Sequence, residues 1–317
     1  MIPDHLKAQV AQLPRSTGVY LFKDKEDNLL YVGKSKELRT RVSSYFRGDL
    51  RDKDLRLQRM IHDVRSIEHL RSSSELLALL LEDSLIKHGD PVYNLRQNKY
   101  RRYVYLKFTN DPFPRLESIP QSQTAEGPLY GPYPDEYFLP RLESLLGRHY
   151  GLRNCHDKNP TQVCMQADLG LCLAPCVNQD AVDEYAQTVD RVHGLLVGDD
   201  ASLLEVIKSA MALAVKEEEF ETAARCRDEL QFAGSMIERQ RFTRDFTNKS
   251  LTLDDEQGFT CKFTCGDLVE ILPASDLLDG DRTLLNEDPI DDDRFLLDRA
   301  YILSRWLSRH NLDHHFS

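Results

Sequence analysis

The sequence has no run of about 18 or more apolar residues, the length that a membrane-spanning helix needs. Its first residues, MIPDHLKAQVAQLP, lack the basic segment followed by an apolar segment that marks a secretory signal. Internal repeats and long low-complexity segments are also missing. We therefore expect a cytoplasmic protein with no membrane partner, whose 317 residues suffice for two or three domains.

Positive charge is in deficit over the whole chain, whose formal net charge of -11 argues at first against a nucleic-acid partner. The distribution reverses that impression. Lys34 to Arg71 contains 11 Lys or Arg and 6 Asp or Glu, and Arg96 to Lys107 contains 5 Lys or Arg and no acid. Leu251 to Ser317 contains 15 acids and 6 bases. Because screening limits the field to about 8 Å, DNA would meet the local basic surfaces.

Residues 1–95 predict one compact module. Two β-rich runs, Gly18 to Phe22 and Leu29 to Val32, flank the polar turn KDKEDN and predict a hairpin, to which Ser66–Leu70 adds a third strand. The runs GKSKELRTRVSSYF and SSSELLALLLEDSLIKHG predict helices. In the second run, Ser72 and Glu75 have the spacing of a capping box, and Gly89 is a stop signal.

The rest of the chain predicts three further segments. Residues 96–200 contain a hairpin, YVYLKF and PRLESI around the turn TNDPFP, followed by a helix and a cysteine-rich stretch. Residues 201–241 are helical on both sides of the charged sequence KEEEF, which predicts a helical hairpin. Residues 242–317 form an acidic C-terminal region with a short helical run near its end. The pattern predicts an α+β protein.

Two cationic side chains and a phenol follow the sequence Tyr31-Val32-Gly33 at helical spacing. If the following helix starts there, Lys34, Arg41 and Tyr45 stand at i, i+7 and i+11 and lie on one stripe. Two cations and a phenol in a row suit a phosphate group. Taken alone, the stripe is also explained by a solvated helix surface.

Glu82 interrupts the apolar helix LLALLLEDSLIK. A buried carboxylate costs several kcal/mol unless a cation or hydrogen bonds compensate it. One interpretation is a salt bridge to Arg or Lys. The other is a ligand for a hard divalent cation such as Mg²⁺.

Four of the seven cysteines, Cys155, Cys164, Cys172 and Cys176, fall within 22 residues. Without an export signal, disulfides are not the first interpretation of such a set. Four thiols can hold Zn²⁺ or an iron–sulfur cluster. Cys261 and Cys265 form a second close pair without partners, and Cys226 falls in a helical run.

The motifs of the first hundred residues, taken in order, resemble the GIY-YIG nuclease domain, and most closely its version at the N-terminus of UvrC-family excision-repair nucleases. The matching features are Gly18-Val19-Tyr20, Tyr31-Val32-Gly33, Lys34, Arg41, Tyr45, Glu82 and Asn94. The resemblance implies a small three-stranded antiparallel sheet flanked by helices. It also implies hydrolysis of DNA phosphodiesters with a single Mg²⁺ or Mn²⁺ ion.

The resemblance assigns a role to each matching residue. Glu82 would hold the metal, and Tyr31 would act as general base on the attacking water. Lys34 and Arg41 are expected to lower the pKa of Tyr31, and Arg41 to stabilise the charge that develops on the phosphoryl oxygens. The remaining roles are positional: Tyr20 and Tyr45 would place water and phosphate, and Asn94 would orient its loop by hydrogen bonds.

Two later stretches extend the resemblance. The sequence from YGPYP to LCLAPC resembles the region after the nuclease module in UvrC proteins, where four cysteines carry a [4Fe-4S] cluster. Zn²⁺ remains the alternative, although zinc ribbons usually use two close-spaced pairs and only Cys172 and Cys176 are close-spaced here. The run FETAARCRDELQ resembles the UVR motif, through which UvrC proteins bind the damage-loading helicase UvrB. It assigns partner contacts to Phe220, Ala223, Ala224 and Arg227.

UvrC proteins of full length continue into an RNase H-like nuclease and a helix-hairpin-helix pair. Because 67 residues come after Ser250, the chain resembles instead the shorter Cho homologues, which cut damaged double-stranded DNA 3′ of the lesion. Two alternatives remain open at this point. One is a sequence-specific GIY-YIG nuclease, although no helix-turn-helix or zinc-finger pattern is present to read bases. The other is a non-catalytic DNA-binding subunit.

Overall fold

The computed structural model describes residues 2–49, 54–94, 103–120, 127–133, 138–155, 162–198, 200–288, 290, 292–310, 312 and 314–317. The chain divides into two compact units, which are described separately: Met1–Tyr100 with Phe242–Ser317, and Arg101–Arg241. The described strands form three antiparallel sheets accompanied by helices, which confirms the α+β class. No helix in these ranges is long and apolar enough to cross a membrane.

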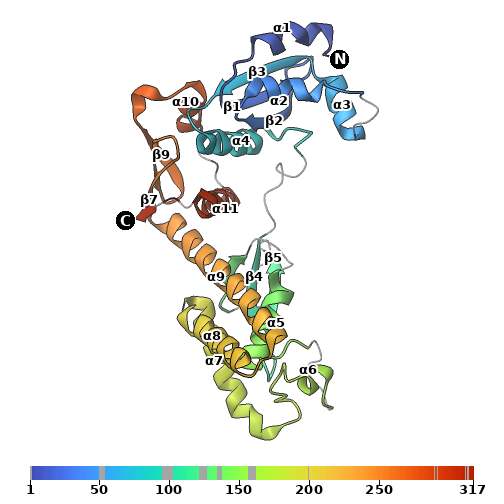
Figure 1. Cartoon of the computed structure of the whole chain (residues 1–317), viewed down its shortest axis with the longest axis vertical. Coiled ribbons are helices and arrows are strands. Elements are labelled where there is room, and N and C mark those ends of the chain that lie inside the picture. Colours follow the sequence, from blue (N-terminus) through green and yellow to red (C-terminus); the bar gives the residue numbers. More distant parts are fainter. Residues whose placement is uncertain are drawn as a thin grey trace. The chain divides into compact units, whose positions relative to one another are not determined.

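The N-terminal part of the first unit is a three-stranded sheet with the strand order β2-β1-β3, as expected. Figure 1 shows this sheet in blue beside its helices. The elements, in chain order, are α1 (Asp4–Gln12), β1 (Gly18–Lys23), β2 (Leu29–Ser35), α2 (Leu38–Tyr45), α3 (Leu55–Asp63), β3 (Ser66–Arg71) and α4 (Glu75–Gly89).

Two local expectations were wrong. The helix expected from Gly33 begins only at Leu38, because β2 stays paired with β1 as far as Ser35. Lys34 therefore lies on a strand and not on a helical stripe with Arg41 and Tyr45. At α4 the N-cap is Ser74, whose side chain accepts a hydrogen bond from the Leu77 amide, so Ser72 and Glu75 form no capping box there.

The C-terminal part of the first unit is a four-stranded sheet with two helices. Its strands have the order β10-β7-β8-β9. The elements are β7 (Ser250–Asp254), β8 (Thr260–Thr264), β9 (Asp267–Leu272), the 3-10 turn η3 (Ala274–Asp276), α10 (Asp279–Leu285), α11 (Asp293–His310) and β10 (His314–Phe316).

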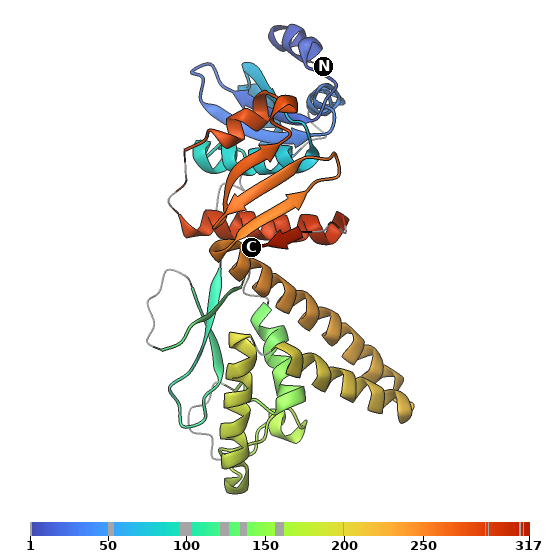
Figure 2. The ribbon, with the colours of Figure 1, turned by 90° about the vertical axis from the view of Figure 1, so that its left-hand side faces the viewer.

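The two parts of this unit share one hydrophobic core. Leucines of α4, among them Leu77 and Leu81, are buried in the same cluster as Phe263 of β8 and Leu303 and Trp306 of α11. Figures 1 and 2 show α4, in teal, next to the orange and red C-terminal elements. The acidic C-terminal region is thus continuous with the module that contains the predicted nuclease residues.

The second unit combines a small sheet with a set of helices. The sheet has the strand order β5-β4-β6 and contains the expected second hairpin, β4 with β5. Arg96 to Arg102, most of the second basic stretch, lie outside the described residues. The elements are β4 (Val104–Phe108), β5 (Leu116–Pro120), β6 (Tyr130–Tyr133), α5 (Phe138–Tyr150), α6 (Met165–Asp168), the 3-10 turn η2 (Gln179–Ala181), α7 (Val182–Val197), α8 (Asp200–Lys216) and α9 (Phe220–Asn248).

Helices α8 and α9 confirm the expected helical hairpin around KEEEF. Helix α9 runs on to Asn248, and its last turns, from Phe242, belong to the first unit.

Candidate active site

The two glycines of the nuclease motifs are required by close contacts. A Cβ atom on Gly33 would stand 2.4 Å from the hydroxyl oxygen of Tyr20. A Cβ atom on Gly18 would stand 2.2 Å from the carbonyl oxygen of Leu70 on β3. Both separations are far below van der Waals contact. Only glycine at position 33 therefore leaves room for the Tyr20 side chain against β2, and only glycine at position 18 lets β1 and β3 approach each other so closely.

Three tyrosines meet in one cluster. The hydroxyl groups of Tyr20 and Tyr45 are 2.7 Å apart, and the Tyr45 hydroxyl lies 3.4 Å from that of Tyr31. Tyr20 and Tyr31 come from β1 and β2, and Tyr45 from the end of α2. Their ring centroids are separated by about 6 Å, with Phe22 packed among them. The sheet and α2 thus gather three phenols that are far apart in sequence.

Replacing Gly33 by Ala tests this packing. The added methyl group would displace the fully buried ring of Tyr20, and overpacking of this kind costs about 1–3 kcal/mol. We expect a lower melting temperature and loss of the Tyr20–Tyr45 hydrogen bond, with a corresponding fall in activity. Gly234→Ala is the control, because nothing lies within 4 Å of a Cβ atom there and its backbone is helical. Equal melting temperatures for the two variants would contradict the contact.

Glu82 lies on α4 and is 8% exposed. Its Oε1 atom accepts a hydrogen bond of 2.8 Å from the backbone amide of Lys34. Burial raises the pKa of Glu82 to about 7, against the opposing effects of that amide and of the charges of Lys34 and Arg41. Among the ion pairs of the described residues, none involves Glu82. A direct salt bridge, the first of the two interpretations of this residue, therefore does not compensate the buried carboxylate in the described structure.

Glu75 is a member of the site that sequence reasoning missed. Its two carboxylate oxygens bind the ammonium groups of Lys34, at 2.9 Å, and Lys36, at 2.7 Å. Burial alone would raise the pKa of Glu75, but the hydrogen bonds from both lysines outweigh it and lower the pKa. A signal was present in the sequence, because Glu75 and Glu82 are seven residues apart and so share a face of α4. Glu75 thereby fixes the position of Lys34.

The expectation that nearby cations lower the pKa of Tyr31 was wrong. Burial raises it, and Tyr45 and the charge of Glu82 raise it further. Burial likewise raises the pKa of Tyr20. In the protein without metal, both groups are therefore neutral phenols at physiological pH, able to donate hydrogen bonds.

Arg41 and Asn94 complete the set. The guanidinium carbon of Arg41 lies 5.4 Å from the centre of the Tyr45 ring, within the range of a cation–π contact. Asn94 is 3% exposed and binds both backbone groups of Val32: Oδ1 accepts from its amide at 2.9 Å and Nδ2 donates to its carbonyl at 2.8 Å. Asn94 therefore anchors β2 beside Tyr31 and Gly33.

The four clustered cysteines lie in the second unit. All four are free thiols of intermediate exposure. Burial raises the pKa of Cys172, and the charges of Cys155, Cys164 and Cys176 raise it further, so the four thiols are electrostatic neighbours. The backbone amide of Ala174 donates to Cys172 Sγ at 3.3 Å. In the described part of the chain, no group of three or more His, Cys, Asp or Glu side chains is arranged to hold a metal ion as it stands.

The remaining cysteines lie apart from these four. Cys226 and Cys261 are buried in hydrophobic cores, and Cys265 is exposed.

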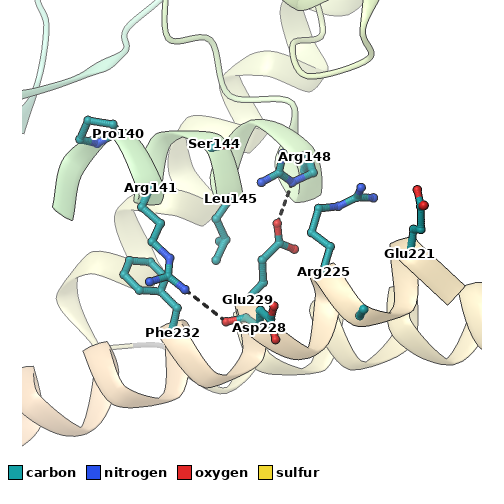
Figure 3. A pocket seen from close by; sticks show the side chains of 11 residues that line it. Pro140, Arg141, Ser144, Leu145, Arg148, Glu221, Arg225, Asp228, Glu229 and Phe232 are labelled. Atoms are coloured by element: carbon teal, nitrogen blue, oxygen red, sulfur yellow. Dashed lines mark hydrogen bonds and ion pairs between the residues drawn. The ribbon is translucent and has the colours of Figure 1, made fainter. Parts of the chain in front are cut away.

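One face of α9 is occupied by α5 of the same unit, across a groove shown in Figure 3. Glu229 of α9 is 7% exposed and binds Arg148 at 2.7 Å and His149 at 2.8 Å. Burial alone would raise the pKa of Glu229, but the hydrogen bonds from His149 and Arg148 lower it. The guanidinium of Arg141 lies 4.1 Å from the centre of the Phe232 ring. These contacts hold α9 against α5 along this face.

The ends of α8 and α9 that flank the turn between them carry exposed apolar side chains. Phe220 is 71% exposed, Leu213 54% and Val215 56%. Of the other predicted partner contacts, Ala224 lines the groove with α5, and Arg227 pairs with Asp228 at 2.8 Å. Ala223 is half-buried. The structure therefore separates the apolar tip of the hairpin from the face that packs inside the unit.

Three family models match consecutive parts of the chain. The UvrC-like GIY-YIG domain matches residues 16–95. The middle domain of the UvrC/Cho excinucleases matches residues 103–194, and the UvrB/uvrC motif matches residues 201–233. Together these matches cover well over half of the chain, in the order that the sequence motifs predicted.

Among solved structures, the chain is similar to the GIY-YIG N-terminal endonuclease domain of UvrC from Thermotoga maritima. The form bound to magnesium is 29% identical over 29% of this chain and 98% of that one, with a TM-score of 0.26. A point mutant of the same domain, bound to its catalytic divalent cation, is 30% identical over 29% of this chain and 96% of that one, with the same TM-score of 0.26. On the evidence of the three consecutive family models, the chain belongs to the UvrC/Cho family of excision-repair nucleases, and its N-terminal module is a GIY-YIG endonuclease domain.

Proposed function

We propose that the protein makes the incision 3′ of a lesion in damaged double-stranded DNA loaded by UvrB, by metal-dependent hydrolysis of one phosphodiester bond. The observation that carries the catalytic part is Glu82, a buried carboxylate without an ion-pair partner in the described structure, which interacts electrostatically with Tyr31, Lys34 and Arg41. We expect the work of DNA repair to place the protein in the cytoplasm.

Glu82 fits a single divalent cation. Mg²⁺ commonly takes one or two protein carboxylates and keeps several waters, so it needs no larger set of ligands here. The second carboxylate oxygen of Glu82 would face the ion, while Oε1 stays bound to the Lys34 amide. When bound, Mg²⁺ or Mn²⁺ would neutralise charge on the scissile phosphate and the leaving 3′ oxygen.

The other residues act on water and phosphate. Arg41 would bind the phosphoryl oxygens, where charge develops in the transition state. Lys34, held by Glu75, would add a second positive charge beside them. Tyr31, once deprotonated, would take the proton of the attacking water, while the Tyr45 hydroxyl, itself hydrogen-bonded to Tyr20, donates a hydrogen bond to it. Since the pKa of Tyr31 is raised in the metal-free protein, this role requires a positive charge close to the phenol.

A nicking assay tests the whole proposal. The substrate is a duplex with one defined adduct, labelled on both strands and incubated with and without UvrB in Mg²⁺. We expect one cut 3′ of the adduct that depends on UvrB. Cutting at a fixed undamaged sequence would favour a sequence-specific nuclease. Binding without any cut would favour a non-catalytic subunit, and either result would overturn the proposal.

We propose that Cys155, Cys164, Cys172 and Cys176 hold a [4Fe-4S] cluster, with Zn²⁺ as the alternative. The fit rests on four free, half-buried thiols that influence one another electrostatically. The amide of Ala174, which donates to Cys172 Sγ, would stabilise the charge of a bound thiolate. The cluster would cross-link the parts of the chain between α5 and α7 that contain these cysteines.

We propose that the helical hairpin docks onto UvrB through its tip. Phe220, the first residue of α9, is 71% exposed, and Leu213 and Val215 near the end of α8 are exposed as well. An exposed aromatic side chain of this kind serves as an anchor at protein interfaces. The opposite face of α9 is already held by α5 through Glu229.

Truncating Phe220 to Ala should weaken UvrB binding. Anchors of this kind often cost about 2 kcal/mol, or roughly a 30-fold loss of affinity. Because the side chain is 71% exposed, folding should be unaffected, and cutting of naked DNA at high enzyme concentration should persist. Titration calorimetry with UvrB measures the loss.

The matched control for this variant is Val269→Ala, which truncates another exposed apolar side chain, 55% exposed on β9. It should bind UvrB normally. An unchanged affinity in a well-folded Phe220→Ala protein would mean that recruitment uses another surface.

A further inference from the structure

Acidic side chains of the C-terminal region bind at both ends of α4. Lys87, near the end of the helix, pairs with Asp298 at 2.7 Å, and both side chains are almost fully buried. The Ser84 hydroxyl donates to Glu287. Just before the helix, Arg71 binds Asp279 at 3.0 Å. Three acids of this region are therefore bound to the nuclease module.

Asp281 of α10 is the most completely buried of these acids, with 0% exposure. Its carboxylate accepts from the Ser72 hydroxyl at 2.8 Å, from the Ser73 amide at 3.0 Å, from the Ser73 hydroxyl, and from its own Leu278 amide at 3.0 Å. Such bonds to an ionised acceptor are about twice as strong as neutral ones. In the described structure, the hydrogen bonds between this carboxylate and the nuclease module thus all involve Ser72 and Ser73, the two residues before the N-cap of α4.

The backbone of α10 also lies against this turn. A Cβ atom on Gly280 would stand 2.6 Å from the carbonyl oxygen of Arg71 and 2.8 Å from a methyl carbon of Leu81. Only glycine permits that approach, so α10 packs in one defined position against the junction of β3 and α4.

The functional part of α4 begins directly after this junction. Ser74 caps the helix, and Glu75, its first residue, binds Lys34 and Lys36. Glu82 lies two turns further along, on the same face. Because a helix is stiff over two turns, the direction of its first turn sets the position of both carboxylates. A shift of about 1 Å at a catalytic group can cost roughly 100-fold in rate.

We propose that Asp281 is a positioning residue for the nuclease reaction: by fixing Ser72 and Ser73, it sets the start of α4 and thereby the place of Glu82 and of the Lys34–Glu75 pair. The inference rests on the proposed metal role of Glu82. It gives the acidic C-terminal region a function in catalysis, as the support of the metal-binding helix.

The test uses Asp281→Asn in the full-length protein. Asparagine keeps one acceptor oxygen and the shape of the side chain, but it removes the charge and the second acceptor. We expect the Mg²⁺ concentration for half-maximal nicking to rise about tenfold and kcat to fall about tenfold, while KM for DNA changes less than about twofold. Calorimetric titration with Mn²⁺ measures metal affinity independently of nuclease activity, and it should show the same loss.

Two controls separate positioning from folding. Glu270→Gln removes a charge from the same region, at a residue that pairs with Lys262 on the C-terminal sheet, and should change none of these values. Leu303→Ala opens the shared core away from the start of α4 and should lower the melting temperature without changing the Mg²⁺ midpoint. A wild-type Mg²⁺ midpoint and kcat in Asp281→Asn would overturn the proposal.

If Asp281→Asn does not fold, Ser73→Ala carries the test, because it removes only the Ser73 hydroxyl from the contacts. A rise of about threefold in the Mg²⁺ midpoint is expected, and an unchanged midpoint would overturn the inference. Glu82→Gln is measured beside it. Retained cutting in that variant would refute the metal role itself, whereas an inactive Glu82→Gln with normal Asp281→Asn and Ser73→Ala proteins would refute the positioning role alone.

Discussion

Replacing Glu82 by Gln is expected to lower nicking by at least about 1,000-fold while leaving the fold and DNA binding intact. Removing the carboxylate removes the only charge that this side chain offers to a metal, and metal stabilisation of the transition state contributes several kcal/mol. Glutamine keeps the hydrogen bond from the Lys34 amide, so the local structure should survive. The measurement is single-turnover nicking in Mg²⁺, together with DNA binding by fluorescence anisotropy.

The same substitution should stabilise the metal-free protein at high pH. The pKa of Glu82 is raised from 4.5 to about 7 in the folded state, so the folded protein holds this proton more tightly than the unfolded chain. Its contribution to stability is present below pH 4.5 and is lost as the pH rises through about 7, by about 3 kcal/mol at most. Glu82→Gln should therefore unfold at higher denaturant concentration than the wild type at pH 8 without metal.

Adding Mg²⁺ at pH 8 should reverse the order, because the ion stabilises only the wild type. Glu68→Gln is the control: this residue pairs with Lys23 on the surface of β3 and should change neither nicking nor the pH dependence. Near wild-type cutting by Glu82→Gln, or an identical pH dependence of unfolding, would contradict the burial and metal role of this carboxylate.

Protein purified without oxygen is expected to contain close to four iron atoms per chain and to show iron–sulfur absorbance. Substituting Cys172 by Ser should remove the iron and lower the melting temperature of the second unit, because a bound cluster would cross-link the segments that contain its cysteines. Iron and sulfide analysis, with electron paramagnetic resonance after reduction, measures the outcome.

The control is Cys265→Ser, which alters an exposed thiol in the turn between β8 and β9 of the other unit. Iron content should stay at the wild-type value. Stoichiometric zinc without iron in the anaerobic preparation would replace the cluster by a zinc site. Unchanged iron in Cys172→Ser would remove this cysteine from the ligand set.

The nuclease character of the N-terminal module could be read from the sequence, because its motifs follow the GIY-YIG pattern in order. Glu82 was also visible as a carboxylate in a leucine-rich helix, where it indicates a function or a close contact. The close contact at Gly33 was not visible, because the sequence predicts a strand that ends at Val32, whereas the structure continues it to Ser35. The hairpins and the helical pair were equally predictable, since their periodicity and turn residues are local signals.

The placement of Lys34 required the tertiary structure. Its sequence is compatible with a helix start, but pairing with β1 continues to Ser35 and keeps Lys34 on β2. The pKa of Tyr31 was likewise decided by folding, because burial raises it and the neighbouring Tyr45 and Glu82 raise it further. Local sequence gives the chemical groups, whereas desolvation depends on what packs around them.

The role of the acidic C-terminal region was the least accessible from sequence. Composition indicated only surplus negative charge, and Ser72 suggested a helix cap. The structure instead joins Ser72 to Asp281, 209 residues further along the chain, and leaves the cap to Ser74. The physical reason is that capping signals act within one helical turn. A buried carboxylate instead binds the donors that lie near it in the folded core, and long-range contacts that no local pattern encodes determine which donors those are.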